Sequence, residues 1–150
     1  MKQNHFGKNL LIFLLGFLSL GALGGGIALI ISPDGSAIQM PLELIDNSSF
    51  NNYLIPAIIL FTVFGMMPIG IIFALIRKPQ SKFFNRLNLL SDHHFAWTFA
   101  VYMGFGQIIW INIQTLIMNA VGIIHTAYAG LGILIICIAL LPNTRKNYLL

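Results

Sequence analysis

Long apolar runs alternate with short polar segments along the chain. The runs at 10–31 and 53–76 contain no charged residue, and a third run, 95–144, contains no Asp, Glu, Lys or Arg. A membrane-spanning helix needs about 20 predominantly apolar residues, because each helical residue rises about 1.5 Å through about 30 Å of hydrocarbon. The first two runs therefore match one crossing each, whereas the third is long enough for two.

The third run divides most naturally at 114–120, where Asn, Gln and Thr side chains gather. This division predicts an all-α membrane protein in which residues 1–150 form a single domain, a four-transmembrane-helix bundle. The expected helices lie near 10–31, 53–76, 95–113 and 121–141. Pro68 lies well inside the second helix, and we expect a kink there because proline removes a backbone hydrogen bond and clashes with the preceding turn.

A cleaved signal peptide is the alternative interpretation of the first run, since Lys2 and Lys8 precede it. The apolar part of a signal peptide is only about 7–15 residues long. The run at 10–31 is longer, so we interpret it as a retained span.

The composition agrees with a bilayer environment, because 57% of the residues are hydrophobic and only 8% are charged, against about a quarter in soluble proteins. In the four-helix topology all eight basic residues fall on one side of the membrane. They are Lys2, Lys8, Arg77, Lys78, Lys82, Arg86, Arg145 and Lys146. The loop on the opposite side carries Asp34, Glu43 and Asp46.

Basic residues near helix ends remain in the cytoplasm during insertion. We therefore expect a multi-pass protein of the cell membrane with both termini in the cytoplasm. The net charge of +4 then reflects topology, and no nucleic-acid partner is expected.

Small residues are spaced for close helix contact in two of the predicted helices. In the first, Gly21 pairs with Gly25 and Ala22 with Gly26. The corresponding set in the fourth helix is Gly122, Thr126 and Gly130. Helices in lipid associate through such residues, and we favour packing within the bundle. Contact with a second copy or with another membrane protein through these faces is the alternative, and membrane lipids are the other partners expected.

The predicted spans lack the charged residues that proton transfer and ion transport in membranes usually require. None contains Asp, Glu, Lys or Arg, which removes the usual proton relays and ion pathways. No nucleophile elbow, zinc-binding His motif or carboxylate pair is present. His94 and His125 are expected at opposite membrane faces, so they cannot share a haem iron within one subunit. We predict no catalytic residue, no metal site and no cofactor.

Polar side chains do gather at the outer end of the third helix. Unpaired amides are costly in lipid, so these side chains must turn inward or reach the headgroups. The candidate outer binding pocket combines them with one acidic residue of the loop between the first two helices. Its residues are Trp110, Asn112, Gln114, Asn119, His125 and Asp34. Interfacial anchoring with hydrogen bonds between helices is the alternative.

The outer loop between the first two helices is predicted to be structured. The stretch Pro-Asp-Gly-Ser at 33–36 is a turn signature. Pro41 suits the first turn of a short helix at 40–45, in which Leu42 and Ile45 can face apolar surface. We expect this loop to close as a lid over the polar end of the third helix. The residues beneath the lid would be Asn112, Gln114 and Asn119.

Three segments resemble a set of small bacterial four-helix membrane proteins of unknown function. They are SPDGSAIQMPLELIDNSSFNNYLIPAIILF at 32–61, WTFAVYMGFGQIIWINIQ at 97–114 and LLPNTR at 140–145. The resemblance rests on a Pro-Asp-Gly turn, a Met-Pro, a Phe before Leu-Ile-Pro, and a Trp-Ile in the third helix. Ala57 departs from the glycine usual in that set. The resemblance implies a bacterial inner-membrane bundle and brings no activity with it.

The sequence favours a non-enzymatic integral membrane protein, an interaction or structural subunit of the cytoplasmic membrane, because no catalytic site is visible. The alternative is a protein that binds or transports a lipid, a quinone-like molecule or another small amphiphile through an outward-facing polar pocket. An enzyme is the third class.

The topology can be tested with single cysteines at Ser36 and Ser81 in a Cys137→Ala background. We expect a membrane-impermeant thiol reagent to label the first from outside intact cells and the second only after permeabilisation, because the basic residues lie on the side of Ser81. The reverse labelling pattern would refute the topology.

Overall fold

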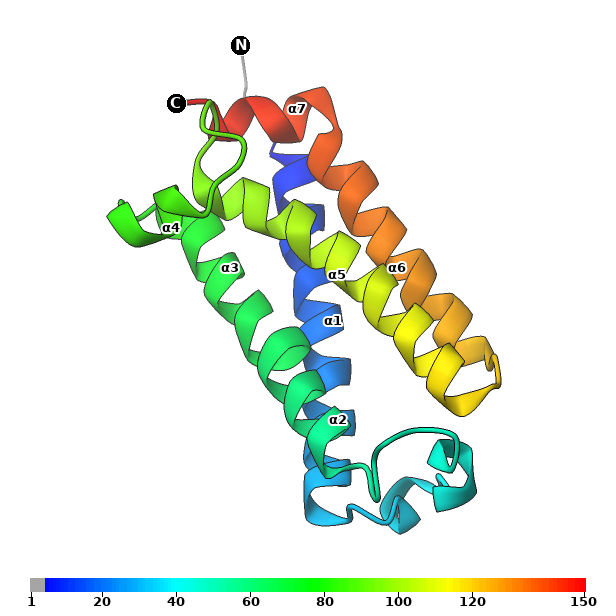
Figure 1. Ribbon diagram of the computed structural model, residues 1–150. Helices are drawn as coiled ribbons and strands as arrows, with labels where there is room; N and C mark the ends of the chain where they lie inside the picture. The colour runs from blue at the N-terminus through cyan, green and yellow to red at the C-terminus, as the bar shows by residue number, and fades with distance from the viewer. Residues whose placement is uncertain (1–4) are drawn as a thin grey trace.

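The computed structural model describes residues 5–150, and every regular element it contains there is helical (Figure 1). Four helices are long and apolar enough to span a membrane, which confirms that part of the prediction. They are α1 (Phe6–Ile31), a second helix at Leu54–Arg77, α5 (Phe95–Met118) and α6 (Ile123–Leu140). The second helix consists of α2 (Leu54–Ile59), the π-helical segment η3 (Leu60–Met66) and α3 (Met67–Arg77). The short elements are η1 (Ser36–Ile38), η2 (Leu42–Ile45), α4 (Lys82–Arg86), α7 (Pro142–Arg145) and η4 (Lys146–Tyr148).

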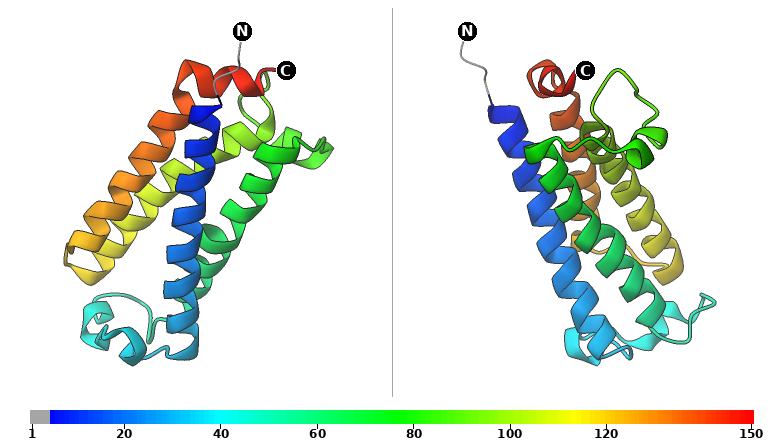
Figure 2. Two further views of the ribbon diagram at one scale, coloured as in Figure 1. Left: turned by 180° about the vertical axis from the view of Figure 1, so that it is seen from behind. Right: turned by 90° about the vertical axis from the view of Figure 1, so that its left-hand side faces the viewer.

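The four long helices pack in a ring. α1 contacts the second helix on one side and α6 on the other, and α5 contacts α6 and α3. Figures 1 and 2 show that the α5–α6 pair diverges from α1 and α2 towards the C-terminal end of α5. The loop at 32–53 crosses this divergent end of the bundle.

The buried apolar residues form two separate clusters. The larger one extends from the end where α5 begins to Trp110 in the second half of that helix, and Leu11, Leu15, Leu75 and Ile135 are fully inaccessible within it. The smaller one lies under the loop and consists of Leu29, Ile45, Tyr53 and Ala57. The divergence of the helices separates the two clusters.

Close helix contacts in the bundle use glycine, though only partly the glycines that the spacing pointed to. Gly26 of α1 lies against the backbone of Phe61, where an added Cβ would be 3.1 Å from its Cα. α5 and α6 cross where Gly104 and Gly132 face each other, since a Cβ on either would lie 2.9 Å from the carbonyl oxygen of the other. The predicted α6 set is instead exposed. Its members are Gly122, Thr126 and Gly130.

The second helix accommodates Pro68 through a change of helix type. The seven-residue π-helical segment η3 ends just before α3, and Pro68 is the second residue of α3. Proline has no N–H to donate and crowds the preceding turn, and a π-type turn is one way to absorb that disruption. Ser19 of α1 donates a 2.6 Å hydrogen bond to the Gly65 carbonyl within η3. The irregular turn therefore has a polar partner inside the bundle.

α5 continues to Met118, beyond the predicted end at 113. Its polar side chains do not break the helix because they bond within it. The Asn112 amide donates to the Ile108 carbonyl at 2.8 Å, and the Thr115 hydroxyl donates to the Asn112 carbonyl at 2.9 Å. The helix ends at Asn119, whose φ of 44° is left-handed.

The loop at 32–53 is tied together by its own hydrogen bonds. Gly35 has a φ of 79°, and its carbonyl accepts from the Met40 N–H at 3.0 Å. Tyr53 donates its N–H to the Pro33 carbonyl and its hydroxyl to the Pro41 carbonyl, each at 2.8 Å. These bonds join the two ends of the loop to its middle.

The predicted short helix at 40–45 is a 3-10 turn, η2, in the structure. Ile45 is buried beneath it as expected, but Leu42 is exposed, so only one of the two predicted apolar anchors packs against the bundle. The Asp34 carboxylate accepts hydrogen bonds from the Ser32 hydroxyl and from the N–H and hydroxyl of Ser36. These bonds, the one from Ser32 foremost, lower the pKa of the Asp34 carboxyl.

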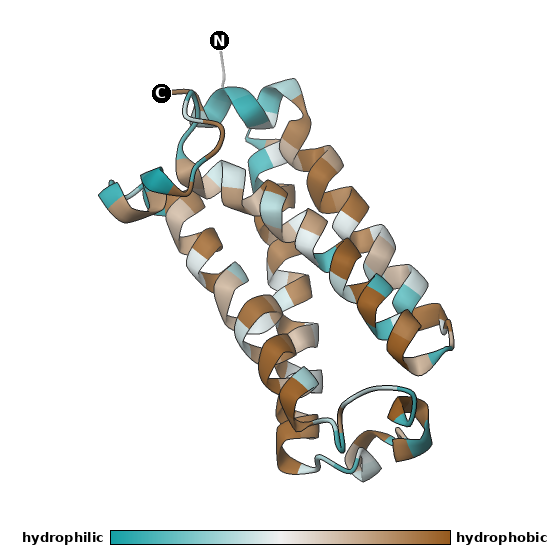
Figure 3. Cartoon of the chain, in the orientation of Figure 1, coloured by the Kyte–Doolittle hydropathy of each residue, from teal (hydrophilic) through white to brown (hydrophobic). Residues whose placement is uncertain are grey.

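Hydrophilic residues gather at the two ends of the bundle (Figure 3). The described basic residues lie at the start of α1, the end of α3, in α4, and in α7 and η4. These elements share the end that holds the chain termini in Figure 1. Asp34, Glu43 and Asp46 lie in the loop at the other end.

We expect Gly35→Ala to destabilise the protein, because the new methyl group would collide with the Met40 carbonyl and φ is 79°. A non-glycine residue held at such an angle costs about 1–3 kcal/mol. Thermal unfolding in mild detergent should show a clear fall in midpoint. Gly130→Ala is the control, because no heavy atom lies within 4 Å of its Cβ position. An equal loss in both variants would contradict the packed turn.

Candidate functional site: a cavity between α1, α5 and α6

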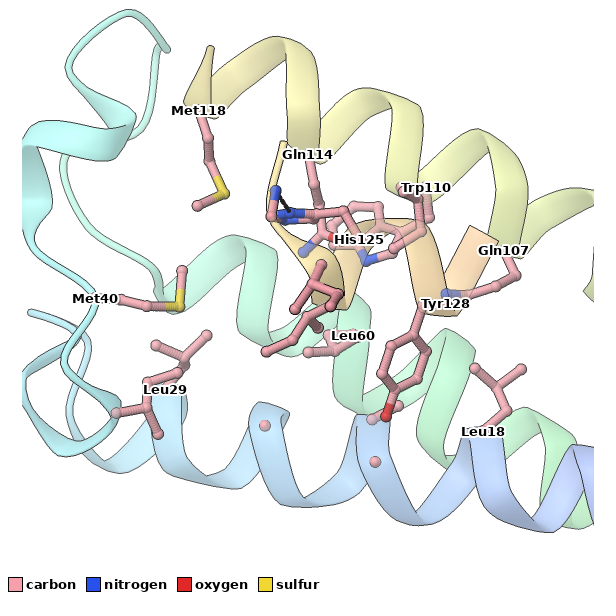
Figure 4. A pocket seen from close by; sticks show the side chains of 18 residues that line it. Leu18, Leu29, Met40, Leu60, Gln107, Trp110, Gln114, Met118, His125 and Tyr128 are labelled. Atoms are coloured by element: carbon pink, nitrogen blue, oxygen red, sulfur yellow. Dashed lines mark hydrogen bonds between the residues drawn. The ribbon is translucent and has the colours of Figure 1, made fainter. Parts of the chain in front are cut away.

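A cavity of about 500 Å³ lies where the helices diverge, between α1, α5, α6 and the loop. Figure 4 shows α1 along one side, with side chains of α5 and α6 facing it. The lining residues are Leu18, Gly21, Ala22, Gly25, Leu29, Ile38, Met40, Leu60, Gln107, Trp110, Ile111, Gln114, Met118, Gly122, Ile123, Ile124, His125 and Tyr128. This volume is within the usual range for small-molecule sites, about 300–1,000 Å³.

The cavity wall formed by α1 is apolar, and few of its side chains are large. Its lining residues run from Leu18 to Leu29 along one helix face, a length of about 16 Å. Gly21 and Gly25 have no side chain to fill the space, and the Tyr128 hydroxyl reaches across to Gly21, where an added Cβ would collide with it. The small residues that suggested helix contact therefore also shape a cavity wall.

The opposite wall is polar. Gln107, Trp110 and Gln114 line it from one face of α5, at spacings of three and four residues. Gln107 is 2% exposed and Trp110 is 8% exposed. Within the described part of the chain, neither Oε1 of Gln107 nor Nε1 of Trp110 has a hydrogen-bond partner. A buried polar group left unpaired costs about 1–3 kcal/mol.

The polar residues on α6 are differently placed. His125 Nδ1 accepts a 3.1 Å hydrogen bond from the Gly122 N–H, the contact dashed in Figure 4. The neutral ring therefore carries its proton on Nε2. Tyr128 stacks on Phe17 of α1, with ring centroids 6.4 Å apart. Both side chains have structural contacts as well as a place in the wall.

The structure divides the six residues of the predicted pocket. Trp110, Gln114 and His125 line the cavity together. Asn112 and Asn119 are exposed outside it, because Asn112 bonds to its own helix and Asn119 forms the end of α5. Asp34 borders a separate shallow depression on the loop.

Sequence reasoning missed Gln107, Tyr128 and the α1 wall. The predicted pocket took Asn112, Gln114 and Asn119 from the outer end of α5, yet the face that turns inward begins at Gln107. A signal was present in the spacing of Gln107, Trp110 and Gln114, but periodicity alone does not say which polar face of a helix meets a neighbour.

A second cavity of about 230 Å³ lies directly beneath the loop. Ile45, Phe50 and Tyr53 line it from the loop side, and Ile113 and Ile117 line it from α5. The two cavities share part of their walls. The shared residues are Leu29, Met40, Leu60, Trp110, Gln114 and Met118. The loop thus covers Gln114 and the apolar end of α5, while it leaves Asn112 and Asn119 exposed.

A different polar cluster lies at the opposite end of the bundle. His93 is 1% exposed, accepts a 2.8 Å hydrogen bond from Arg145 Nε at its Nε2, and lies with Nδ1 2.7 Å from Asp92 Oδ1. Its ring stacks on Trp97 at 4.5 Å. With both ring nitrogens engaged and the ring enclosed, this histidine ties the C-terminal segment to α5 rather than facing a ligand.

The remaining polar groups at this end also have structural partners. His94 begins α5, where its Nδ1 accepts from the Ala96 N–H, and its Nε2 is 3.0 Å from the Pro79 carbonyl oxygen. The Tyr148 hydroxyl donates to the Leu75 carbonyl at 3.1 Å, and burial raises its pKa to about 12. Residues 5–150 contain no group of three or more His, Cys, Asp or Glu side chains that could hold a metal ion.

Comparison of the chain with protein-family models, with curated proteins and with solved structures finds no match. The chemistry of the cavity itself is therefore the basis for a function.

We expect Asp92→Asn to destabilise the protein at neutral pH and much less in acid. The hydrogen bond from His93, assisted by Arg145, holds the pKa of the Asp92 carboxyl below its ordinary 3.8. A lowered folded-state pKa means that the stabilisation is present above the unfolded-state pKa of about 4 and is lost as the pH falls through the folded value. Thermal unfolding at pH 7 and at pH 3 measures the difference.

Asp46→Asn is the control for Asp92→Asn, since it removes an exposed carboxylate at the other end of the bundle. A midpoint difference between Asp92→Asn and wild type that stays constant with pH would contradict the role of this ion pair.

Proposed function

We propose that this chain is a non-enzymatic integral protein of a bacterial cytoplasmic membrane that binds a small uncharged amphiphile, such as a lipid or a quinone-like molecule, between α1, α5 and α6. One observation carries the proposal. Oε1 of Gln107 and Nε1 of Trp110 are buried without partners at the wall of a cavity of about 500 Å³. Buried polar groups in proteins are nearly always paired, and a ligand in the cavity that these two side chains line would offer them a polar partner.

The charge of the lining supports an uncharged ligand. Among residues 5–150, no Asp, Glu, Lys or Arg lines this cavity or the adjoining one beneath the loop. A charged group moved from water into such surroundings would have no counter-charge. Trp110 Nε1–H needs an acceptor and Gln107 Oε1 needs a donor, and a hydroxyl group can serve as both. The apolar α1 wall suits the hydrocarbon part of the same molecule.

The placement of charges supports an outward-facing site. Basic residues lie at the end of the bundle away from the cavity, and basic residues remain in the cytoplasm. With both termini in the cytoplasm, the loop at 32–53 is the outer loop and acts as the lid of the site. Ile38 and Met40 of the loop form part of the cavity wall.

A second candidate is an interaction subunit that associates with a second copy or another membrane protein through α6. It is supported by the exposure of Gly122, Thr126 and Gly130. Small residues of this spacing favour close helix contact in lipid.

The ligand proposal is tested by purification in mild detergent, solvent extraction and mass spectrometry of what is bound per mole of protein. We expect wild-type protein to retain an uncharged amphiphile, and Gln107→Leu or Trp110→Phe to retain about tenfold less, since each removes one hydrogen bond of about 1.5 kcal/mol. Asn112→Leu is the matched control, because it makes the same kind of change on α5 outside the cavity.

The same variants distinguish a loss of folding from a loss of ligand binding. Gln107→Leu removes an unpaired buried amide, so the stability of the ligand-free protein should not fall. Equal amphiphile occupancy in Gln107→Leu, Trp110→Phe and wild type would refute the site. A stoichiometric protein partner with no bound small molecule would support the interaction subunit instead.

A further inference from the structure

A separate groove lies on another side of the bundle, near the basic end. It has a volume of about 530 Å³ and runs between the second helix and α5, with α4 at its mouth. Its lining residues are Val63, Phe64, Met67, Ile71, Phe83, Phe84, Leu87, Phe99, Tyr102, Met103 and Gly106. None of them lines the cavity between α1, α5 and α6, although Phe64 of the groove stacks on Trp110 of that cavity with ring centroids 5.7 Å apart.

The depth of this groove matches one leaflet of a bilayer. Gly106 at its inner limit is eleven residues from the start of α5, a distance of about 16 Å along the helix. Half of the hydrocarbon core is about 15 Å thick. The groove therefore extends from the membrane surface to about the midplane.

The lining of the groove is suited to a hydrocarbon chain. Tyr102 is its only residue with a polar side chain, and its hydroxyl already accepts from the Leu89 N–H at 3.0 Å and donates to the Leu87 carbonyl at 3.3 Å. These bonds also hold the segment after α4 beside the groove. Phe84 packs on Phe95 and Phe99, with centroids at 5.2 and 5.8 Å, so the aromatic side of α4 is fixed towards the groove.

The basic residues at the mouth of the groove are suited to binding an anion. Phe83, Phe84 and Leu87 of the α4 region line the groove, while Lys82, Asn85 and Arg86 occupy the remaining positions of α4. Neither Lys82 nor Arg86 has an ion pair or side-chain hydrogen bond within residues 5–150. Asp92, the acidic residue at this end, is already paired with His93 and Arg145.

We propose that the groove holds one acyl chain of an anionic phospholipid, whose phosphate is bound at the mouth by Lys82 and Arg86. The apolar lining takes the chain, and the two unpaired cations neutralise the headgroup. Anionic lipids attract basic residues at the membrane surface, and arginine binds phosphate through its planar fork. The helix α4 thus contacts both the headgroup and the acyl chain of the lipid.

The test is native mass spectrometry of detergent-purified protein incubated with equal amounts of phosphatidylglycerol and phosphatidylcholine of the same chain length. Wild-type protein should bind one phosphatidylglycerol in preference to phosphatidylcholine by about tenfold or more, on the scale expected for two surface cations. The double variant Lys82→Gln with Arg86→Gln should lose that preference. Lys8→Gln with Lys146→Gln is the matched control, since it removes the same charge at the same end away from the groove.

Gly106→Leu tests the chain-binding half of the proposal. A Cβ there would lie 3.9 Å from Phe64 Cε1, an ordinary contact, so a larger side chain can grow into the groove. We expect it to lower bound phosphatidylglycerol without changing any charge. The proposal is overturned if the Lys82/Arg86 variant behaves like its control or if Gly106→Leu retains wild-type phosphatidylglycerol.

Discussion

Polar groups inside hydrocarbon have no water to bond to, so the protein itself must supply their partners, and much of the bundle follows from this constraint. Ser19 bonds to the irregular turn at Gly65, and the Trp97 indole donates to the Ala139 carbonyl at 2.8 Å. Asn112 bonds back to its own helix. Against this background the buried unpaired atoms of Gln107, Trp110, Thr98 and Thr144 are exceptions, and of these four residues Gln107 and Trp110 line the cavity.

The two ends of the bundle are built differently. At the basic end, His93, Arg145 and Tyr148 bind the C-terminal segment to α5 and α3 over a continuous apolar core. At the other end the helices diverge, and a loop with its own small core closes the gap. The rigid end fixes the angle between the helix pairs, and that angle opens the cavity. The main apolar core and the candidate site adjoin each other, since Leu18, Ala22 and Trp110 belong to both.

The helices could be predicted from the sequence because hydrocarbon thickness sets their length and their apolar character directly. Features that depend on the contact between two elements could not be predicted from the sequence. The contact of Gly104 with Gly132 needs the crossing point of α5 and α6, and the inward turn of Gln107 needs the position of α1. The end of α5 was misplaced for a related reason, since Asn112 and Thr115 satisfy themselves within the helix instead of ending it.

The hydrogen bonds of the loop at 32–53 have a consequence for how tightly it seals the cavity. Within residues 5–150 they run inside the loop and to its own ends, with none to α5 or α6. Met40, Ile45 and Phe50 therefore hold the loop against the bundle by apolar contact at the water-facing end. Apolar attraction of this kind weakens on cooling. The seal over the cavity is accordingly looser in the cold, while the loop, fastened by its internal bonds, keeps its shape.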